Sequence, residues 1–253
     1  MKVKYSDLKN KRVFITGGGS GIGASIVEYF CEQESEVFFV DINFKDSKKL
    51  LNIIKKKKFR APKFIECNLL DIGKLEKIIK KIISTYGPIQ ALVNNAANDD
   101  RHNTKQVDEK YWENRMAINL KHYFFAAKAV VDGMKKNKGG TIVNLSSVSW
   151  MLGEGDKVVY ETAKSAVVGL TRSFAQEFGK HNIRTNSVMP GSIATERQIK
   201  YWLTPKYKKL ILDKQALKRQ LKPNDVAQLV LFLSSDQSSG CTKQSFVVDG
   251  GIT

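Results

Sequence analysis

The sequence predicts an α/β protein in which a doubly wound parallel sheet of seven strands carries helices on both faces. Short apolar runs that can form strands alternate with helical segments along the whole chain. Apolar strands separated by helices are typical of a parallel sheet that is buried on both sides. No repeat or linker interrupts the alternation, so residues 1–253 are expected to form one domain.

The first unit of the alternation occupies residues 11–43, where a strand enters a glycine-rich loop, a helix follows, and a second strand ends at Asp41. Residues 192–221 stand outside the alternation, and a long insertion above a sheet is often a substrate lid. The other expected elements are strands at 62–66, 89–94, 140–146, 183–189 and 244–248, and helices at 45–58, 73–86, 108–136, 157–179 and 224–235.

The composition is that of a globular protein, since 42% of the residues are hydrophobic and no apolar run reaches the roughly 18 residues of a membrane span. The charged start MKVKYSDLKNK lacks the apolar segment of a secretory signal. Cys31, Cys67 and Cys241 are widely separated and lack metal-ligand spacing, which argues against a disulfide framework or a zinc site. A metal-free protein of the reducing cytoplasm is expected.

The net charge of +17 raises the hypothesis of nucleic-acid binding. The lysines are spread along the chain, mostly near expected helix ends, and no aromatic residues are interleaved with them. This distribution favours a solvated basic surface with weak, salt-sensitive polyanion binding. No specific nucleic-acid partner and no membrane partner are expected.

The glycine-rich loop has the pattern T-G-x-x-x-G-x-G between the first strand and the first helix. Glycine permits a tight turn and a close approach of backbone N–H groups to a pyrophosphate, and a helix N-terminus favours negative charge. A dinucleotide site is therefore predicted, built from Gly17, Ser20, Gly21, Ile22 and Gly23.

Asp41 ends the second strand, where a carboxylate can accept hydrogen bonds from the adenosine ribose hydroxyls. A 2′-phosphate at that place meets a like charge, and neither Ile42 nor Asn43 supplies a compensating cation. Lys45 is the nearest cation that follows in the sequence. The sequence therefore favours NAD over NADP.

Tyr160 and Lys164 are four residues apart in an expected helix and so lie about one turn apart on one face. An ammonium beside a phenol lowers the pKa of the phenol and turns it into a general base. The pair alone also fits a tyrosine that packs under a lysine stem.

Six motifs in register give the pair a context: TGGGSGIG, NNAA, the asparagine of MAINL, LSS, YETAK and PGSIAT, followed by the ending VVDGG. In order and spacing they resemble the short-chain dehydrogenase/reductase family, with its Rossmann fold, from end to end. The resemblance implies that Tyr160 is the general base, that Lys164 lowers its pKa and binds the nicotinamide ribose, and that Ser147 holds the reacting oxygen. It implies that Asn119 holds a water that relays protons from Lys164. It also suggests a homotetramer.

The resemblance further implies that Asn95 flanks the cofactor, that Ile193 and Thr195 contact its nicotinamide carboxamide and phosphate side, and that Asn68 and Leu69 lie at the adenine. Two positions depart from the family pattern. Asn68 replaces an aspartate but can still accept a hydrogen bond from the adenine amino group. Ala97 replaces a glycine, which is tolerable where the backbone φ is negative.

The run NDDRH at 98–102 follows an expected strand at the edge where doubly wound folds bind ligands. Its donors and acceptors suit a polyhydroxylated substrate, although an exposed polar loop has the same composition. With SSVSWMLGEGD, TERQ, WLTP and LFLSSDQSSGCTKQ, the run resembles a narrower branch, the bacterial aldose 1-dehydrogenases that act on D-xylose, L-arabinose, L-fucose or galactose. This implies a sugar site lined by Asn98, Ser147, Trp150, Glu154, Tyr160, Gln198 and Trp202. A core position in a lid helix is an equally good interpretation of Trp202.

On this hypothesis Tyr160 removes the proton of the anomeric hydroxyl while C1 delivers hydride to NAD, which gives an aldonolactone. Two alternatives stay open. One is a 3-oxoacyl-carrier-protein reductase or other ketone reductase, whose acidic carrier the basic surface would attract. The other is a catalytically idle NAD-sensing or nucleic-acid-binding module on the same fold.

Overall fold

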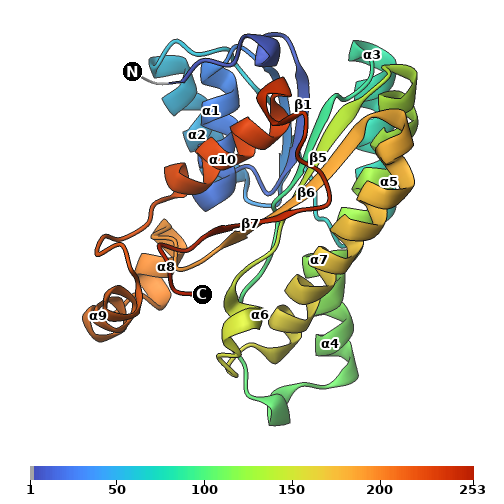
Figure 1. Cartoon of the computed structure of the whole chain (residues 1–253). Coiled ribbons are helices and arrows are strands. Elements are labelled where there is room, and N and C mark those ends of the chain that lie inside the picture. The colour runs from blue at the N-terminus through green and yellow to red at the C-terminus, as the bar shows by residue number, and fades with distance from the viewer. Residues whose placement is uncertain (1–2) are drawn as a thin grey trace.

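The computed structural model describes residues 3–253, which form one parallel sheet of seven strands in the order β3-β2-β1-β4-β5-β6-β7 (Figure 1). The predicted doubly wound sheet is thereby confirmed. The strands are β1 (Arg12–Thr16), β2 (Glu36–Asp41), β3 (Lys63–Glu66), β4 (Ala91–Asn94), β5 (Gly140–Leu145), β6 (Ile183–Pro190) and β7 (Ser245–Val248).

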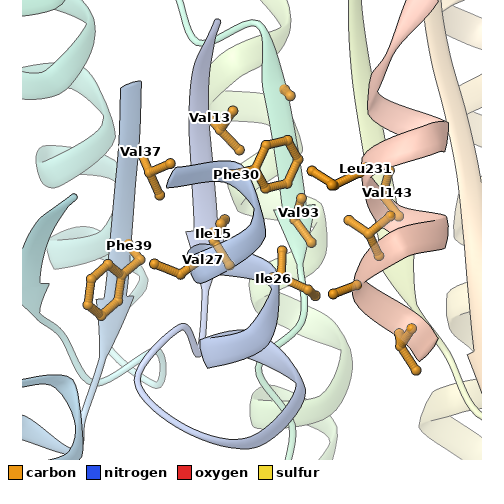
Figure 2. Close-up of a cluster of buried hydrophobic side chains, with 14 of the residues drawn as sticks. Val13, Ile15, Ile26, Val27, Phe30, Val37, Phe39, Val93, Val143 and Leu231 are labelled. Carbon is orange, nitrogen blue, oxygen red and sulfur yellow. The ribbon is translucent and has the colours of Figure 1, made fainter. Parts of the chain in front are cut away.

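Helices cover both faces of the sheet (Figure 1). One face packs against α1 (Gly21–Glu32), α2 (Phe44–Lys56) and α10 (Pro223–Ser234), and the other against α3 (Ile72–Tyr86), α5 (His122–Lys136) and α7 (Val158–Phe178). Successive side chains along each strand point to opposite faces of the sheet, so the strands contribute to two hydrophobic cores, one on each face. Val13 and Ile15 of β1 pack toward α1 and α10 (Figure 2), whereas Phe14 between them packs toward α3 and α5.

The strand order reverses direction between β1 and β4, because the chain builds β3-β2-β1 on one side and β4 to β7 on the other. The carboxyl ends of β1 and β4 therefore lie side by side, at the place where open α/β sheets bind ligands. The loops after the two strands are joined there, since the main-chain N–H of Asn95 donates to Thr16 Oγ1 at 3.0 Å. The sheet thus gathers the predicted motifs at one edge.

The segment predicted as a single helix over 108–136 consists of three parts: α4 (Glu109–Met116), a π-helical stretch (Ala117–Lys121) and α5. A π-helical turn inside a helix is common at functional sites and changes which residues share a face. Asn119 lies in this stretch. Hydrophobic periodicity does not distinguish such a turn from regular helix.

Three short helices were not predicted: α6 (Ser149–Leu152), α8 (Glu196–Tyr201) and α9 (Pro205–Lys214). The last two occupy the insertion at 192–221, and their capping residues are visible in the sequence. Thr195 accepts a hydrogen bond from the Gln198 N–H, and Thr204 accepts one from the Tyr207 N–H before Pro205 begins α9. Single 3₁₀ turns complete the elements at Ser6–Leu8, Thr104–Gln106, Gly179–His181 and Asp236–Ser238.

The three cysteines are free thiols. Among the described helices, none combines the length and the apolar character needed to cross a membrane.

Candidate active site

A cavity of about 920 Å³ opens at the carboxyl edge of the sheet. It is continuous from the glycine-rich loop to the insertion that holds α8 and α9. Every residue predicted to bind the cofactor lines it: Gly17, Ser20, Gly21, Ile22, Gly23, Asp41, Asn68, Leu69, Asn95, Tyr160, Lys164, Ile193 and Thr195.

The glycine-rich loop is packed so closely that side chains are excluded from it. Gly17 has φ +65°, and a Cβ atom on Gly23 would lie 1.9 Å from the carbonyl oxygen of Gly17. These two glycines let the loop turn tightly against the start of α1, which leaves backbone N–H groups at the N-terminus of a helix facing the cavity. The loop fits a dinucleotide pyrophosphate.

Asp41 lies at the cavity end of β2, with 9% of its surface exposed. Its Oδ2 accepts a hydrogen bond from the Gly19 N–H at 2.8 Å, and its Oδ1 accepts one from the Asn43 N–H at 2.8 Å. A carboxylate offers about four acceptor positions, so each oxygen can accept a further bond from a ribose hydroxyl. The two backbone bonds fix the orientation of the carboxylate at the edge of the cavity.

Ser147, Tyr160 and Lys164 line the middle of the cavity together. Ser147 follows β5, and the other two lie one turn apart on α7. Lys164 is 1% exposed, and its Nζ donates to the carbonyl oxygen of Leu145 at 2.7 Å and to the hydroxyl of Tyr123 at 2.9 Å. Its Nζ lies 5.6 Å from the centre of the Tyr160 ring.

Burial controls the protonation of both groups. It lowers the pKa of Lys164 to about 7, against a smaller opposing effect of the charge of Asp99. It also raises the pKa of Tyr160 above the ordinary value for a phenol, with Asp99 adding to the rise and hydrogen bonding with Ser147 opposing it. The expected lowering of the Tyr160 pKa is therefore not found in this structure, because desolvation is the largest effect and the charges of nearby carboxylates add to it.

Ser147 is oriented by its neighbour Ser149. Its Oγ donates to Ser149 Oγ at 3.0 Å and accepts the Ser149 N–H at 3.1 Å. The neighbouring Ser146 has a structural contact instead. Its buried Oγ donates to the main-chain oxygen of Lys164 at 2.6 Å and so connects the end of β5 to α7.

Asn119 is fully buried behind the cavity. Its Oδ1 accepts the Asn98 N–H at 2.8 Å, and its Nδ2 donates to the Asn98 carbonyl at 3.1 Å. The amide therefore holds the loop after β4 in place. One donor and one acceptor position of the amide remain for the predicted water.

The end of the cavity near α8 is rich in charged and polar side chains. Asn98, Glu154 and Gln198 line it, as predicted, and so do Asp99, Arg101, Arg115, Lys157, Arg197 and Tyr207, to which the sequence motifs give no role. The four cations in this set are each paired with carboxylates. Sequence motifs do not show this arrangement, because the fold brings together residues about 100 positions apart, such as Asp99 and Arg197.

The two predicted tryptophans do not line the cavity. Trp202 lies behind it and carries the guanidinium of Arg101 on its ring, 4.6 Å from the ring centre. Trp150 is partly buried in α6, next to the lining residue Ser149. The structure therefore places neither indole in the wall of the cavity, and Trp202 packs instead against the lining residue Arg101.

The two departures from the family pattern fit the site. Asn68 lines the cavity, and its Oδ1 accepts the Leu70 N–H at 3.0 Å, which keeps one acceptor position for the adenine amino group. Ala97 is absent from the described residues that have a positive φ, so its methyl group causes no backbone strain.

Comparisons with known proteins agree with this geometry. The family profile described as Enoyl-(Acyl carrier protein) reductase matches residues 17–253. A D-xylose 1-dehydrogenase of Caulobacter vibrioides is 44% identical over 247 residues, which cover 98% of this chain and 97% of that protein. A probable galactose dehydrogenase of Rhizobium meliloti is 39% identical over 249 residues, covering 98% and 97%.

Solved structures show the same fold. A short-chain type dehydrogenase/reductase from Mycobacterium ulcerans superposes with a TM-score of 0.91 at 24% identity, covering 99% of this chain and 91% of that one. A 3-oxoacyl-[acyl-carrier protein] reductase from Brucella melitensis superposes with a TM-score of 0.90 at 28% identity, covering 100% and 98%. The glycine-rich loop, the Ser147, Tyr160 and Lys164 side chains around one cavity, and these full-length matches have a single explanation: the chain belongs to the short-chain dehydrogenase/reductase family and uses a nicotinamide cofactor.

Proposed function

We propose that the protein is an NAD-dependent aldose 1-dehydrogenase, which oxidises C1 of a neutral cyclic sugar of the pentose, 6-deoxyhexose or galactose type to an aldonolactone. The observation that carries this proposal is the polar end of the cavity beside Ser147 and Tyr160. Arg101 pairs with Asp156 at 2.8 Å, Arg115 with Asp100 at 3.1 Å, and Arg197 with Asp99 at 3.3 Å, while Lys157 pairs with Glu154.

The pairing of these cations argues for a neutral substrate. A sugar phosphate or sugar acid needs cations that are free to meet its charge, and here Arg101, Arg115, Lys157 and Arg197 are paired with carboxylates, although the exposed Lys200 of α8 also lines the cavity. An acyl chain would displace water from these polar groups without offering them a hydrogen bond in exchange. The hydroxyl groups of a sugar can both donate to the carboxylates and accept from the guanidinium groups.

NAD is proposed over NADP because Asp41 presents a fixed carboxylate where the adenosine ribose is expected. A 2′-phosphate would meet like charge beside Gly19 and Asn43, whose N–H groups already bind the Asp41 oxygens. Gly17, Gly21 and Gly23 would hold the pyrophosphate, and Lys164 the nicotinamide ribose. When bound, the cofactor accepts the hydride that leaves C1 of the sugar.

The side chains of this protein would orient the sugar and move its proton. Ser147 would hold the anomeric oxygen, and Tyr160 would take the hydroxyl proton as the C1–H bond breaks and the lactone carbonyl forms. The ammonium of Lys164 would stabilise the phenolate form of Tyr160. Asn119 would hold the relay water beside the loop that it fixes.

The helices α8 and α9 would act as a lid, since Arg197 and Gln198 of α8 bind Asp99 on the opposite wall of the cavity.

A ketone reductase acting on 3-oxoacyl thioesters is the second candidate. It is favoured by the full-length likeness to the reductase from Brucella melitensis. The carboxylate of Asp41 disfavours the NADPH that such a reductase would use. We further place the protein in the cytoplasm as a homotetramer, an assembly that light scattering on a sizing column would test.

Formation of NADH or NADPH, followed by absorbance, tests the proposal with neutral aldoses, their phosphate and acid counterparts, and simple alcohols. A reverse assay offers acetoacetyl thioesters. NAD reduction by one or more neutral pentoses, 6-deoxyhexoses or galactose is expected, with slow turnover of the anionic counterparts. Thioester reduction with NADPH, together with inactivity toward all sugars, would establish the second candidate instead.

A further inference from the structure

The ammonium of Lys164 has a second partner that no family motif assigns. Tyr123 of α5 is fully buried, and its hydroxyl lies 2.9 Å from Lys164 Nζ. The same hydroxyl donates to the carbonyl oxygen of Leu145 at 2.9 Å. Because Lys164 Nζ also donates to that carbonyl at 2.7 Å, the three groups form a closed triangle beneath the cavity.

This triangle determines what Lys164 can offer to a ligand. A lysine ammonium has three N–H donors. Two of them are held by Leu145 and Tyr123, so one remains for the cavity that Lys164 lines. The Tyr123 hydroxyl can accept from Lys164 only because its own proton is directed to a carbonyl.

We propose that Tyr123 is a positioning residue for Lys164, whose hydroxyl holds the ammonium so that its remaining N–H faces the nicotinamide ribose and Tyr160. This inference rests on the proposed function, because it assigns Lys164 the role given there. It adds a residue to the site, since phenylalanine at position 123 would fill the same space without accepting a hydrogen bond.

The charged and titratable groups around Lys164 are consistent with this role. Burial raises the pKa of Tyr123 well above the ordinary value, so its hydroxyl stays neutral. Burial lowers the pKa of His122, whose ring packs 4.5 Å from that of Tyr123, to about 3, so His122 stays uncharged near neutral pH. Tyr160 lies on the same helix, and Asp99 is the carboxylate that favours the charged lysine.

The hydroxyl therefore supports the protonated form of Lys164 against the effect of burial. Removing it leaves a buried ammonium donor without a partner, which disfavours the charged form. The pKa of Lys164, already lowered to about 7 by burial, should fall further. Binding of NADH should then weaken at a lower pH than in the wild type, because the neutral form of Lys164 no longer makes a charge-assisted hydrogen bond to the ribose.

The test is Tyr123→Phe, with Tyr86→Phe as the matched control, since Tyr86 is a half-exposed residue of α3. NADH affinity is measured by fluorescence from pH 5.5 to 9, a range of about 1.5 to 2 units on each side of the Lys164 pKa of about 7. The pH midpoint of NADH affinity should move down by about one unit in Tyr123→Phe, and kcat/KM for the sugar should fall about tenfold, as for loss of a hydrogen bond to a charged group. Tyr86→Phe should change neither.

A second variant and the choice of NADH binding as the measurement allow the test to separate the role of Tyr123 from folding and from sugar oxidation. Tyr123→Met also lacks the hydroxyl and fills the space with a flexible side chain, so it should move the midpoint in the same direction if Tyr123→Phe does not fold. An unmoved midpoint in a folded variant, even with a lower melting temperature, would overturn the proposal. NADH binding needs no sugar, so a moved midpoint in an enzyme that oxidises no aldose would refute the proposed function and leave the role of Tyr123 intact.

Discussion

Lys164 of α7 donates a hydrogen bond of 2.7 Å to the main-chain oxygen of Leu145, the last residue of β5. A second bond runs the other way, from Ser146 Oγ to the Lys164 carbonyl at 2.6 Å. These two bonds fasten the helix to the end of the strand, and both are buried from water, which strengthens them. Ser147 follows immediately in the chain, so the same two hydrogen bonds also fix its position beside Tyr160.

Replacing Tyr160 with phenylalanine removes the proposed base and keeps the ring. Sugar oxidation should fall by about 10² to 10⁴, the usual contribution of general base catalysis. NADH affinity should change little, because Lys164 and the glycine-rich loop remain. Steady-state kinetics and a fluorescence titration measure the two quantities, and near-normal turnover would remove Tyr160 from its role.

Asp41→Ala should narrow the proposed preference for NAD over NADP. The change removes the charge that repels a 2′-phosphate, and it also removes the acceptor for the Gly19 and Asn43 N–H groups. Loosening of the loop affects both cofactors, so the ratio of their kcat/KM values is the informative measurement. An unchanged ratio would show that Asp41 does not select the cofactor.

His122 should make the protein sensitive to acid. Burial lowers its pKa in the folded state to about 3 from an ordinary value of 6.5. Between these values the unfolded chain binds more protons than the folded one, so the free energy of unfolding falls as the pH falls through that window. The loss is at most about 1.4 kcal/mol per pH unit for one group.

Urea unfolding of the wild type and of His122→Gln between pH 7 and 5 measures this effect. The stability of the wild type relative to the variant should decline as the pH is lowered. His181→Gln, at a partly exposed position, is the matched control. A difference between wild type and His122→Gln that stays constant with pH would contradict the assignment of a neutral buried histidine.

Arg197→Gln should weaken the contact between α8 and the loop after β4, where Arg197 meets Asp99 and Asp100. Arg197 is 48% exposed, so the ion pairs contribute at most about 1 kcal/mol, and KM for the sugar should rise about two- to fivefold. NADH affinity should stay the same. Lys57→Gln removes a partly exposed pair with Glu28 that does not involve α8, and it serves as the control. A KM that does not respond would argue against α8 as a lid.

The sequence was sufficient for the sheet, because strands buried on both faces leave long apolar runs. It also showed which glycines the loop requires, because positions such as Gly23 admit no other side chain. It did not show the π-helical stretch around Asn119, whose hydrogen bonding has no signature in hydrophobic periodicity. It also did not show Tyr123 beneath Lys164 or Arg197 across from Asp99, since these contacts join residues 41 and 98 positions apart. The pKa of Tyr160 depends on burial, which a motif does not report.

The most direct test of aldose oxidation at C1 uses D-xylose that carries deuterium at C1, incubated with the enzyme and NAD. The proposed reaction transfers that deuterium to the nicotinamide ring, so the NADH formed should be heavier by one mass unit, and the sugar product should be an unlabelled lactone. Unlabelled NADH together with a product that keeps its deuterium would show that oxidation occurs at another carbon and would contradict the account.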